Sequence, residues 1–337
     1  MPLDCENDSL DDWSVHATHK WDAILIGNGL GLNISERFNY GSLLKAAELA
    51  PIAAGMTALD RKLFDAFGTN NFEVVLASLA QAIRAAKALE SPSEQVFQGA
   101  YDRIRASLVA AVCSLHMEWR DLPPATLSAI AAALTSYECV FTTNYDLLLY
   151  WAINFELTSR FRDFFWGGVF NPENTEVSTG TTQLLFLHGG LHLYLDGAGD
   201  ARKRIATSEQ SLLESLKDRL ENEQAPLFVA EGNAPEKRRS INSSAYLSFA
   251  YQRLRMHRKR VVVFGHALGS SDEHLVSALK ASKPCKLAVS VPHGTRAEVI
   301  QAKASILQKF PGLDIVYFDA GTHPLGKATL TLPCKEC

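Results

Sequence analysis

The sequence predicts an α/β protein with a Rossmann-like, doubly wound, mostly parallel six-stranded sheet and a large helical insertion. Six short runs are almost continuous in Val, Ile, Leu and Phe, which is typical of strands covered on both faces. Most of these runs are followed by Gly, Asn, Asp or His, as expected for the ligand-binding loops at the carboxyl ends of parallel strands. The predicted strands span residues 22–26, 138–141, 184–187, 261–264, 286–291 and 314–318.

The chain is predicted to contain an N-terminal arm at residues 1–20 and one domain at residues 21–337. The segment between the first two strands is too long for one crossover helix and has helical periodicity, so we predict a helical insertion over about 41–136. A second insertion is predicted over about 191–259.

Capping signals predict where several helices begin. Asn70 and Glu73 stand at capping-box spacing ahead of an apolar helical stripe. A Pro-Pro pair ending at Pro124 opens the helix that leads to the second strand. In the second insertion, Thr207 opens one predicted helix, a loop follows at 231–239, and another helix covers about 244–258.

The composition is that of an ordinary globular protein, with 47% hydrophobic and 21% charged residues. A net charge of −4 argues against a surface built mainly for nucleic acid. The basic stretch 253–260 is interpreted as the cationic end of a helix, so any contact with nucleic acid is expected to be indirect. No apolar run approaches the ~20 residues that cross a bilayer. Six scattered cysteines favour a reducing cytoplasm over a disulfide framework.

A glycine-rich turn follows the first strand: Gly27-Asn28-Gly29-Leu30-Gly31-Leu32-Asn33. Glycines in such a turn let backbone N–H groups approach a pyrophosphate at a helix N-terminus. The dinucleotide fingerprint requires glycine at its sixth position, where this turn has Leu32. Phosphate binding and a plain tight turn are therefore about equally supported, although Asn28 and Asn33 add hydrogen-bonding capacity that a plain turn does not need.

Two polar side chains flank an aromatic residue after the second strand: Thr142-Thr143-Asn144-Tyr145-Asp146. Asparagine and aspartate are favoured N-caps, so one of them is readily interpreted as the cap of a helix predicted over 147–155. One helix needs only one such residue. We therefore regard Asn144 and Asp146 as candidate catalytic residues and Thr143 as a candidate cofactor-binding residue.

His188 follows the third predicted strand and precedes a Gly-Gly pair. A lone histidine is more often structural than catalytic, but this one is predicted to reach the same sheet edge as Asn144. His192 lies four residues later; the glycines disfavour the helix that would align two ligands, and no third ligand is evident. The Cys-x-x-Cys tail at 334–337 has no second cysteine pair. We predict no metal site.

A third turn follows the fourth predicted strand: Phe264-Gly265-His266-Ala267-Leu268-Gly269-Ser270-Ser271-Asp272. A capped strand-to-helix turn explains Ser271 and Asp272. It does not explain Gly265 at the strand tip, where glycine permits close backbone approach. Gly265, His266, Ser271 and Asp272 are candidate cofactor-binding residues.

The order of these motifs on a six-stranded Rossmann-like sheet resembles the sirtuin superfamily. The sequence is similar to the SIR2-like proteins of bacterial antiphage defence. In overall layout it resembles the SIR2-like group catalogued as a domain of unknown function, DUF4917. The resemblance covers about residues 21–337 and depends on four short motifs.

The resemblance implies that NAD binds across the carboxyl ends of the strands. It implies that Asn144 orients the nicotinamide ribose and a water, that Asp146 holds the nicotinamide carboxamide, and that His188 is the catalytic histidine. It also implies two binding turns, one for phosphate and one for the adenosine ribose. The residues concerned are Gly27, Asn28, Gly29, Gly31 and Asn33 in the first turn, and Gly265, His266, Ser271 and Asp272 in the second.

Protein-deacylating sirtuins usually carry a four-cysteine zinc module after the histidine, but residues 191–259 contain no cysteine. Relatives without this module are linked to NAD hydrolysis. We therefore expect a cytoplasmic NAD+ glycohydrolase that acts in antiphage defence, by abortive infection through NAD depletion. NAD is its expected substrate, without a metal, and its expected partners are further copies of itself or a defence-system protein. A non-hydrolytic NAD or ADP-ribose sensor and a sirtuin-type deacylase or ADP-ribosyltransferase remain alternatives.

Overall fold

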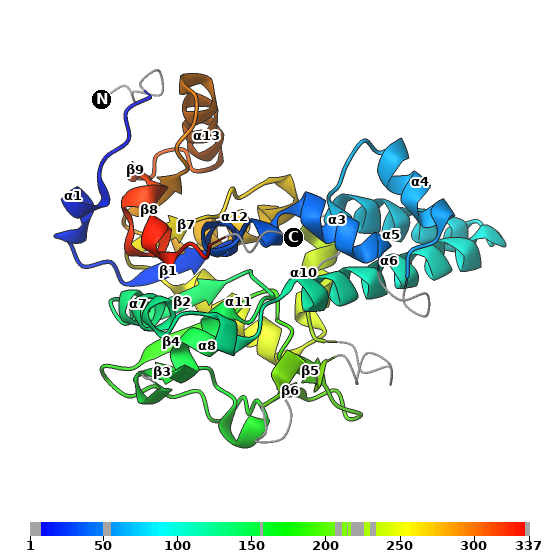
Figure 1. The fold of residues 1–337 in the computed structure, drawn as a ribbon, viewed down its shortest axis with the longest axis horizontal. Coiled ribbons are helices and arrows are strands. Elements are labelled where there is room, and N and C mark those ends of the chain that lie inside the picture. Colours follow the sequence, from blue (N-terminus) through cyan, green and yellow to red (C-terminus); the bar gives the residue numbers. More distant parts are fainter. Residues whose placement is uncertain are drawn as a thin grey trace.

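The structure is a computed structural model, and it describes residues 8–49, 55–155, 158–205, 211–213, 215–216, 226–229 and 234–333. One sheet contains seven strands: β1 (Ala23–Ile26), β2 (Cys139–Thr142), β3 (Phe161–Arg162), β4 (Thr182–Phe186), β7 (Val261–Phe264), β8 (Leu287–Val291) and β9 (Ile315–Asp319). Their order is β3-β4-β2-β1-β7-β8-β9, and every pair is parallel (Figure 1).

The predicted fold class is confirmed, with one more strand than predicted. All six predicted strands are present within two residues of their predicted bounds. The seventh, β3, has only two residues, both half-buried, and it pairs with β4 at the edge of the sheet. Such a short and partly exposed strand leaves no apolar run in the sequence, which explains why it was missed.

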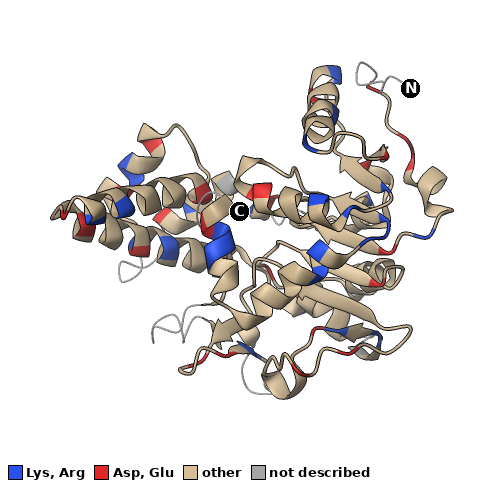
Figure 2. Ribbon diagram, turned by 180° about the vertical axis from the view of Figure 1, so that it is seen from behind, with Lys and Arg blue, Asp and Glu red and all other residues tan. Residues whose placement is uncertain are grey.

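The centre of the sheet is buried on both faces. Every residue of β1, β2, β7 and β8 is buried. Helices lie over both faces, as the front and back views show (Figures 1 and 2). The covering helices include α2 (Gly29–Ile34), α8 (Leu148–Phe155), α12 (Glu273–Ser282) and α13 (Arg296–Lys309).

The chain order places a topological switch point beside β1. From β1 the chain passes to β2 on one side, and after β4 it returns to β7 on the other side of β1. The crevice at the carboxyl ends of the strands beside such a point is the usual ligand-binding place in open α/β sheets. The fold therefore directs attention to the loops that follow β1, β2 and β7.

The segment between β1 and β2 is helical. Its helices are α3 (Tyr40–Glu48), α4 (Ala58–Ala66), α5 (Phe72–Ala88), α6 (Ser93–Leu115) and α7 (Pro124–Leu134), and α4, α5 and α6 extend away from the sheet (Figure 1). The predicted Pro124 start is confirmed. The predicted cap at Asn70 is wrong by one residue, because the Asn71 side chain accepts the Glu73 N–H at 2.8 Å.

The segment between β4 and β7 contains a hairpin and two helices. The antiparallel strands β5 (Leu193–Leu195) and β6 (Ala201–Lys203) form the hairpin, which was not predicted. The predicted second helix is confirmed as α11 (Ala245–Met256), whereas α10 (Ala234–Asn242) occupies most of the predicted loop. The helix start predicted at Thr207 lies outside the described residues, as does the Cys-x-x-Cys tail.

Charged residues pair across the amino-terminal edge of the sheet. The ammonium groups of Lys20 and Lys259 each lie 2.6 Å from a carboxylate oxygen of Glu138, just before β2. Both also lie 3.8 Å from the Asp22 carboxylate, just before β1. Lys259, in the basic stretch 253–260, is therefore engaged in ion pairs within the fold. On the projecting helices, basic and acidic residues are interspersed (Figure 2).

Within the described part of the chain, none of the helices combines the length and the apolar character that a bilayer span requires.

Candidate functional site

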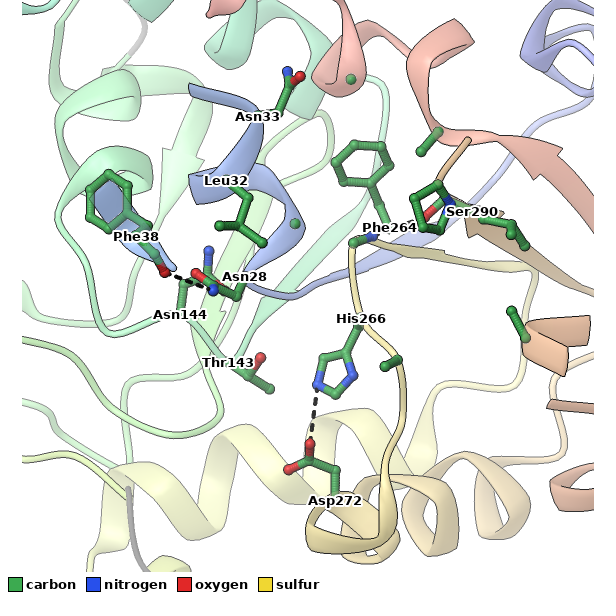
Figure 3. Close-up of a pocket in the computed structure, with 18 of the residues that line it drawn as sticks. Asn28, Leu32, Asn33, Phe38, Thr143, Asn144, Phe264, His266, Asp272 and Ser290 are labelled. Atoms are coloured by element: carbon green, nitrogen blue, oxygen red, sulfur yellow. Dashed lines mark hydrogen bonds and ion pairs between the residues drawn. The ribbon is translucent and has the colours of Figure 1, made fainter. Parts of the chain in front are cut away.

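A cavity of about 1050 Å³ lies at the carboxyl edge of the sheet (Figure 3). Its walls come from the ends of six strands (β1, β2, β4, β7, β8 and β9), from the helical segment before α7 and from α13. Most of the site residues predicted from the sequence lie around this cavity. Those that line the cavity are Asn28, Gly29, Asn33, Thr143, Asn144, Asp146, His188, Gly265, His266, Ser271 and Asp272. Gly27 and Gly31 are not part of the lining.

The glycines at the tips of β1 and β7 let two turns touch. A Cβ atom on Gly29 would lie 2.5 Å from the Gly265 Cα, and one on Gly27 would lie 2.6 Å from the Gly265 carbonyl oxygen. Gly265 has φ of +63°, a conformation that favours glycine. The N–H groups of Gly27 and Gly29 donate to the carbonyls of Phe264 and Gly265, each at 2.9 Å. These two N–H groups therefore serve the packing of the turns.

The two asparagines of the first turn anchor neighbouring segments. The Asn28 amide donates to the Phe38 carbonyl at 3.1 Å (Figure 3). The Asn33 amide donates to the carbonyls of Leu325 and Lys327 at 3.1 and 3.2 Å, which ties the C-terminal segment to α2. Both residues still line the cavity, and each retains an amide oxygen for a ligand.

Asn144 differs from these asparagines because its amide is buried without a partner. The residue is 6% exposed, and neither its Oδ1 nor its Nδ2 has a hydrogen-bond partner within the described residues. Its backbone is fixed, because the Asn144 N–H donates to the Thr142 Oγ1 at 3.1 Å. An unpaired buried polar group costs roughly 1–3 kcal/mol. A rigid, unsatisfied amide that lines a cavity is suited to a polar ligand.

Asp146 caps α8 and also lines the cavity. Its Oδ1 accepts the Leu148 N–H at 2.8 Å, so the capping interpretation of this residue is confirmed. Burial raises its pKa from 3.8 to about 6, against the opposing effect of the Leu148 N–H. The Asn144 amide is close enough to favour the charged form, although it lacks hydrogen-bond geometry.

His188 is held by its backbone at the end of β4. The next residue, Gly189, has φ of +74°, and a Cβ there would lie 2.0 Å from the Leu227 carbonyl oxygen. This close approach lets the Val229 N–H donate to the His188 carbonyl at 2.8 Å. Burial, with Lys237 and two neighbouring histidines, keeps the pKa of His188 well below its usual value. The imidazole is therefore neutral at pH 7.

The partner of His188 is a second histidine. The Nε2 atoms of His188 and His274 lie 2.8 Å apart, and burial lowers the pKa of His274 to about 3. With the Asp272 carboxylate they are the one group of three potential metal-binding side chains found among the described residues. The two Nε2 atoms face each other, and the Lys237 ammonium lies 2.9 Å from the Asp272 carboxylate. This arrangement favours a shared proton over a shared metal ion.

His192 does not join this group. Its ring packs against Tyr150 and Phe186, with centroid distances of 4.8 and 4.5 Å. Burial lowers its pKa to about 3.

An ion network centred on the buried Lys237 closes one wall of the cavity. The Lys237 ammonium on α10 lies 2.9 Å from the Glu73 carboxylate on α5 and 2.9 Å from Asp272 before α12. The Tyr145 hydroxyl donates to Glu73 at 3.0 Å. His266 lies 3.9 Å from Asp272 (Figure 3). The network joins both insertions to the loops that follow β2 and β7.

Sequence reasoning missed several residues of this site. In the sequence, Glu73 stands in a predicted capping box, Lys237 stands in a predicted loop, and His274 follows the third turn without any distinguishing pattern. Ser290 accepts the Gly265 N–H at 2.9 Å and lines the cavity, although it stands inside an apolar strand. A serine interrupting a run of Val, Leu and Ala was the available signal for this residue. Lys237 and His274 offered none.

The comparisons with known proteins identify a family but no function. The chain belongs to the family described as a domain of unknown function, DUF4917, whose sequence pattern matches residues 24–325. The matched range runs from β1 to beyond β9 and includes both insertions. No curated protein matches the chain.

Proposed function

We propose that this protein hydrolyses the N-glycosidic bond of NAD, giving nicotinamide and ADP-ribose. The main support is the unpartnered, buried amide of Asn144 in the same cavity as the neutral His188. The resemblance of the motifs to the SIR2-like proteins supplies the substrate, and the cavity's position at the carboxyl ends of the strands agrees with a nucleotide ligand.

The chemistry requires little from the protein beyond positioning and one base. Nicotinamide is cationic in NAD, so its departure is neutralising, and the transition state resembles the oxocarbenium ion of glycoside hydrolysis. The C1′–N bond breaks, the oxygen of a water bonds to C1′, and the proton of that water passes to His188. Asn144 orients the ribose hydroxyls and the water, because an amide both donates and accepts hydrogen bonds. A neutral imidazole is able to accept the proton.

The two ends of the cavity would take the two ends of NAD. Asp146 would hold the nicotinamide carboxamide, and a pKa of about 6 would let its carboxyl accept or share a proton in that contact. The loop with Gly265, supported by Ser290, would lie against the adenosine ribose. The pyrophosphate would cross the first turn beside Asn28 and Gly29.

As an effector of antiphage defence, such an enzyme would be restrained until infection. Residues of both insertions support this proposal: Glu73 lines the cavity, and Lys237 ties Glu73 to Asp272. We expect a homo-oligomer or a defence-system partner to change this wall. If assembly regulates the enzyme, the isolated monomer and the assembled form will cleave NAD at different rates.

The test is chromatography of NAD incubated with the purified protein. We expect nicotinamide and ADP-ribose in equal amounts, and a rate lower by about 10²–10⁴-fold for His188→Ala, which removes the base. Calorimetric binding of NAD without nicotinamide release, across monomeric and assembled forms, would identify a sensor instead. Nicotinamide release that depends on an acylated peptide or a protein acceptor would identify a deacylase or a transferase.

A further inference from the structure

The two histidines at the end of the cavity meet edge to edge. Their Nε2 atoms are 2.8 Å apart, their ring centroids are 5.0 Å apart, and their planes differ by 24°. The two centroids are farther apart than the two nitrogens by nearly twice the distance from a ring centre to its edge. Each Nε2 therefore lies on the side of its ring that faces the other ring. A hydrogen bond of this kind holds one proton between two neutral rings, and one imidazole must donate while the other accepts.

We infer that His274 is a positioning residue that accepts the Nε2 proton of His188 and thereby keeps the Nδ1 of His188 unprotonated for the reaction. The catalytic consequence depends on the proposed NAD hydrolysis, whereas the protonation pattern itself does not. His188 lines the cavity, and His274 is not part of the lining. His274 therefore acts on His188 and has no contact with the substrate.

Which histidine donates the shared proton determines whether His188 can act as a base. With Nε2 of His188 committed to His274, Nδ1 is the only ring nitrogen left for the substrate. If His274 donated, His188 would carry its own proton on Nδ1 and could not accept one from water. If His274 accepts, the proton from water goes to Nδ1, and the new imidazolium still donates its Nε2–H to His274.

The surroundings hold His274 beside His188. The Asp272 carboxylate has an oxygen within 4.8 Å of one ring nitrogen of each histidine. His274 itself is fixed in place, because it is on α12 and the Tyr251 hydroxyl donates to its backbone carbonyl at 2.8 Å. In this arrangement neutral His274 carries its proton on Nδ1, which is buried without a partner among the described residues. His274 does not line the cavity, and within the described part of the chain its ring forms one hydrogen bond, to His188. The simplest role for His274 is to set which ring nitrogen of His188 carries the proton.

The direct test is nitrogen NMR of the ring nitrogens in the full-length protein labelled with ¹⁵N-histidine, at pH 8 and without NAD. His188→Gln assigns the His188 signals. We expect a protonated Nε2 and a bare Nδ1 on His188. A protonated Nδ1 would overturn the inference, even if the protein cleaves NAD. The expected pattern in a protein that never cleaves NAD would instead leave this inference standing and remove the proposed function.

Two substitutions of His274 give the kinetic test. His274→Gln keeps an acceptor oxygen near the His188 Nε2, whereas His274→Leu removes the acceptor at similar volume. We expect kcat to fall by about 10²–10⁴-fold for leucine, the range of a lost general base, and to fall by less than about tenfold for glutamine. KM for NAD should stay unchanged in both. Equal losses, or no loss, for the two variants would show that the acceptor is irrelevant and would overturn the inference.

Discussion

The two edges of the sheet use polar residues in opposite ways. At the amino edge, Lys20, Asp22, Glu138 and Lys259 form ion pairs. The side chains of Lys20 and Lys259 are more than half exposed, and they would remain hydrated without these contacts. At the carboxyl edge, the Asn144 amide is buried without any partner among the described residues.

The difference separates an edge that contributes to stability from an edge that is suited to binding. Exposed ion pairs contribute about 0–1 kcal/mol each, so substitutions at the amino edge should change the free energy of unfolding little. Leaving a buried amide unpaired costs roughly 1–3 kcal/mol, which a fold retains where a ligand later satisfies the group. Four substitutions test this contrast between the two edges.

Asn144→Ala should reduce NAD cleavage by about 10²–10⁴-fold, the scale of losing one positioned catalytic contact. Thermal unfolding should show no loss of stability, because the amide has no partner among the described residues to lose. Lys259→Met at the amino edge is the matched control and should cleave NAD at the parental rate. Parental activity in the Asn144 variant would remove this residue from the proposed site.

Lys237→Met should destabilise the fold by about 3–5 kcal/mol, because it leaves the partly buried carboxylates of Glu73 and Asp272 beside an uncharged side chain. The Lys237 side chain is 1% exposed, and that of Lys259 is 55% exposed. Lys259→Met should therefore cost less than about 1 kcal/mol. Urea unfolding of the two variants measures both values, and similar losses would contradict the contrast between the edges.

Asp146→Asn should change the pH dependence of stability. Burial raises the pKa of Asp146 from 3.8 to about 6, so the folded state holds this proton more tightly than the unfolded state. That contribution is fully present below pH 3.8 and is lost as pH rises through about 6. At ~1.4 kcal/mol per pKa unit, the wild type should lose about 3 kcal/mol relative to the variant across this interval.

The measurement for Asp146 is the difference between the two unfolding free energies at each pH. The difference is needed because buried histidines titrate in the same range with the opposite sign. Burial lowers the pKa of His116 to about 4 and that of His323 to about 3, so their contributions are lost as pH falls. A difference that does not change with pH would show that Asp146 ionises normally in the folded protein.

Gly265→Ala should destabilise the fold by roughly 1–3 kcal/mol, since its Cβ would lie 2.7 Å from the Gly29 Cα and the residue has positive φ. Gly269→Ala is the control in the same loop, because a Cβ there meets nothing within 4 Å. Denaturant midpoints compare the two variants. Equal stability would indicate that the turns after β1 and β7 do not pack as closely as described.

Much of the fold was predictable because it depends on local patterns. The strands are short apolar runs, and burial on both faces makes such runs continuous. The edge strand β3 and the hairpin of β5 and β6 were missed, because strands of two or three partly exposed residues leave no periodic signal. The polar residues that end β1, β2, β4 and β7 were correctly placed at one edge of the sheet, because parallel strands all end on the same side.

The layer architecture and the set of polar residues at the carboxyl edge therefore follow from local sequence patterns. Which of those polar atoms already have hydrogen-bond partners depends on the tertiary structure. Asn28 and Asn144 are the same residue type after neighbouring strands. The Asn28 amide donates to the Phe38 carbonyl, whereas neither polar atom of the Asn144 amide has a hydrogen-bond partner among the described residues. His188 pairs with His274, 86 residues away. A hydrogen bond depends on atoms that distant segments bring within about 3 Å, and no local pattern records that distance.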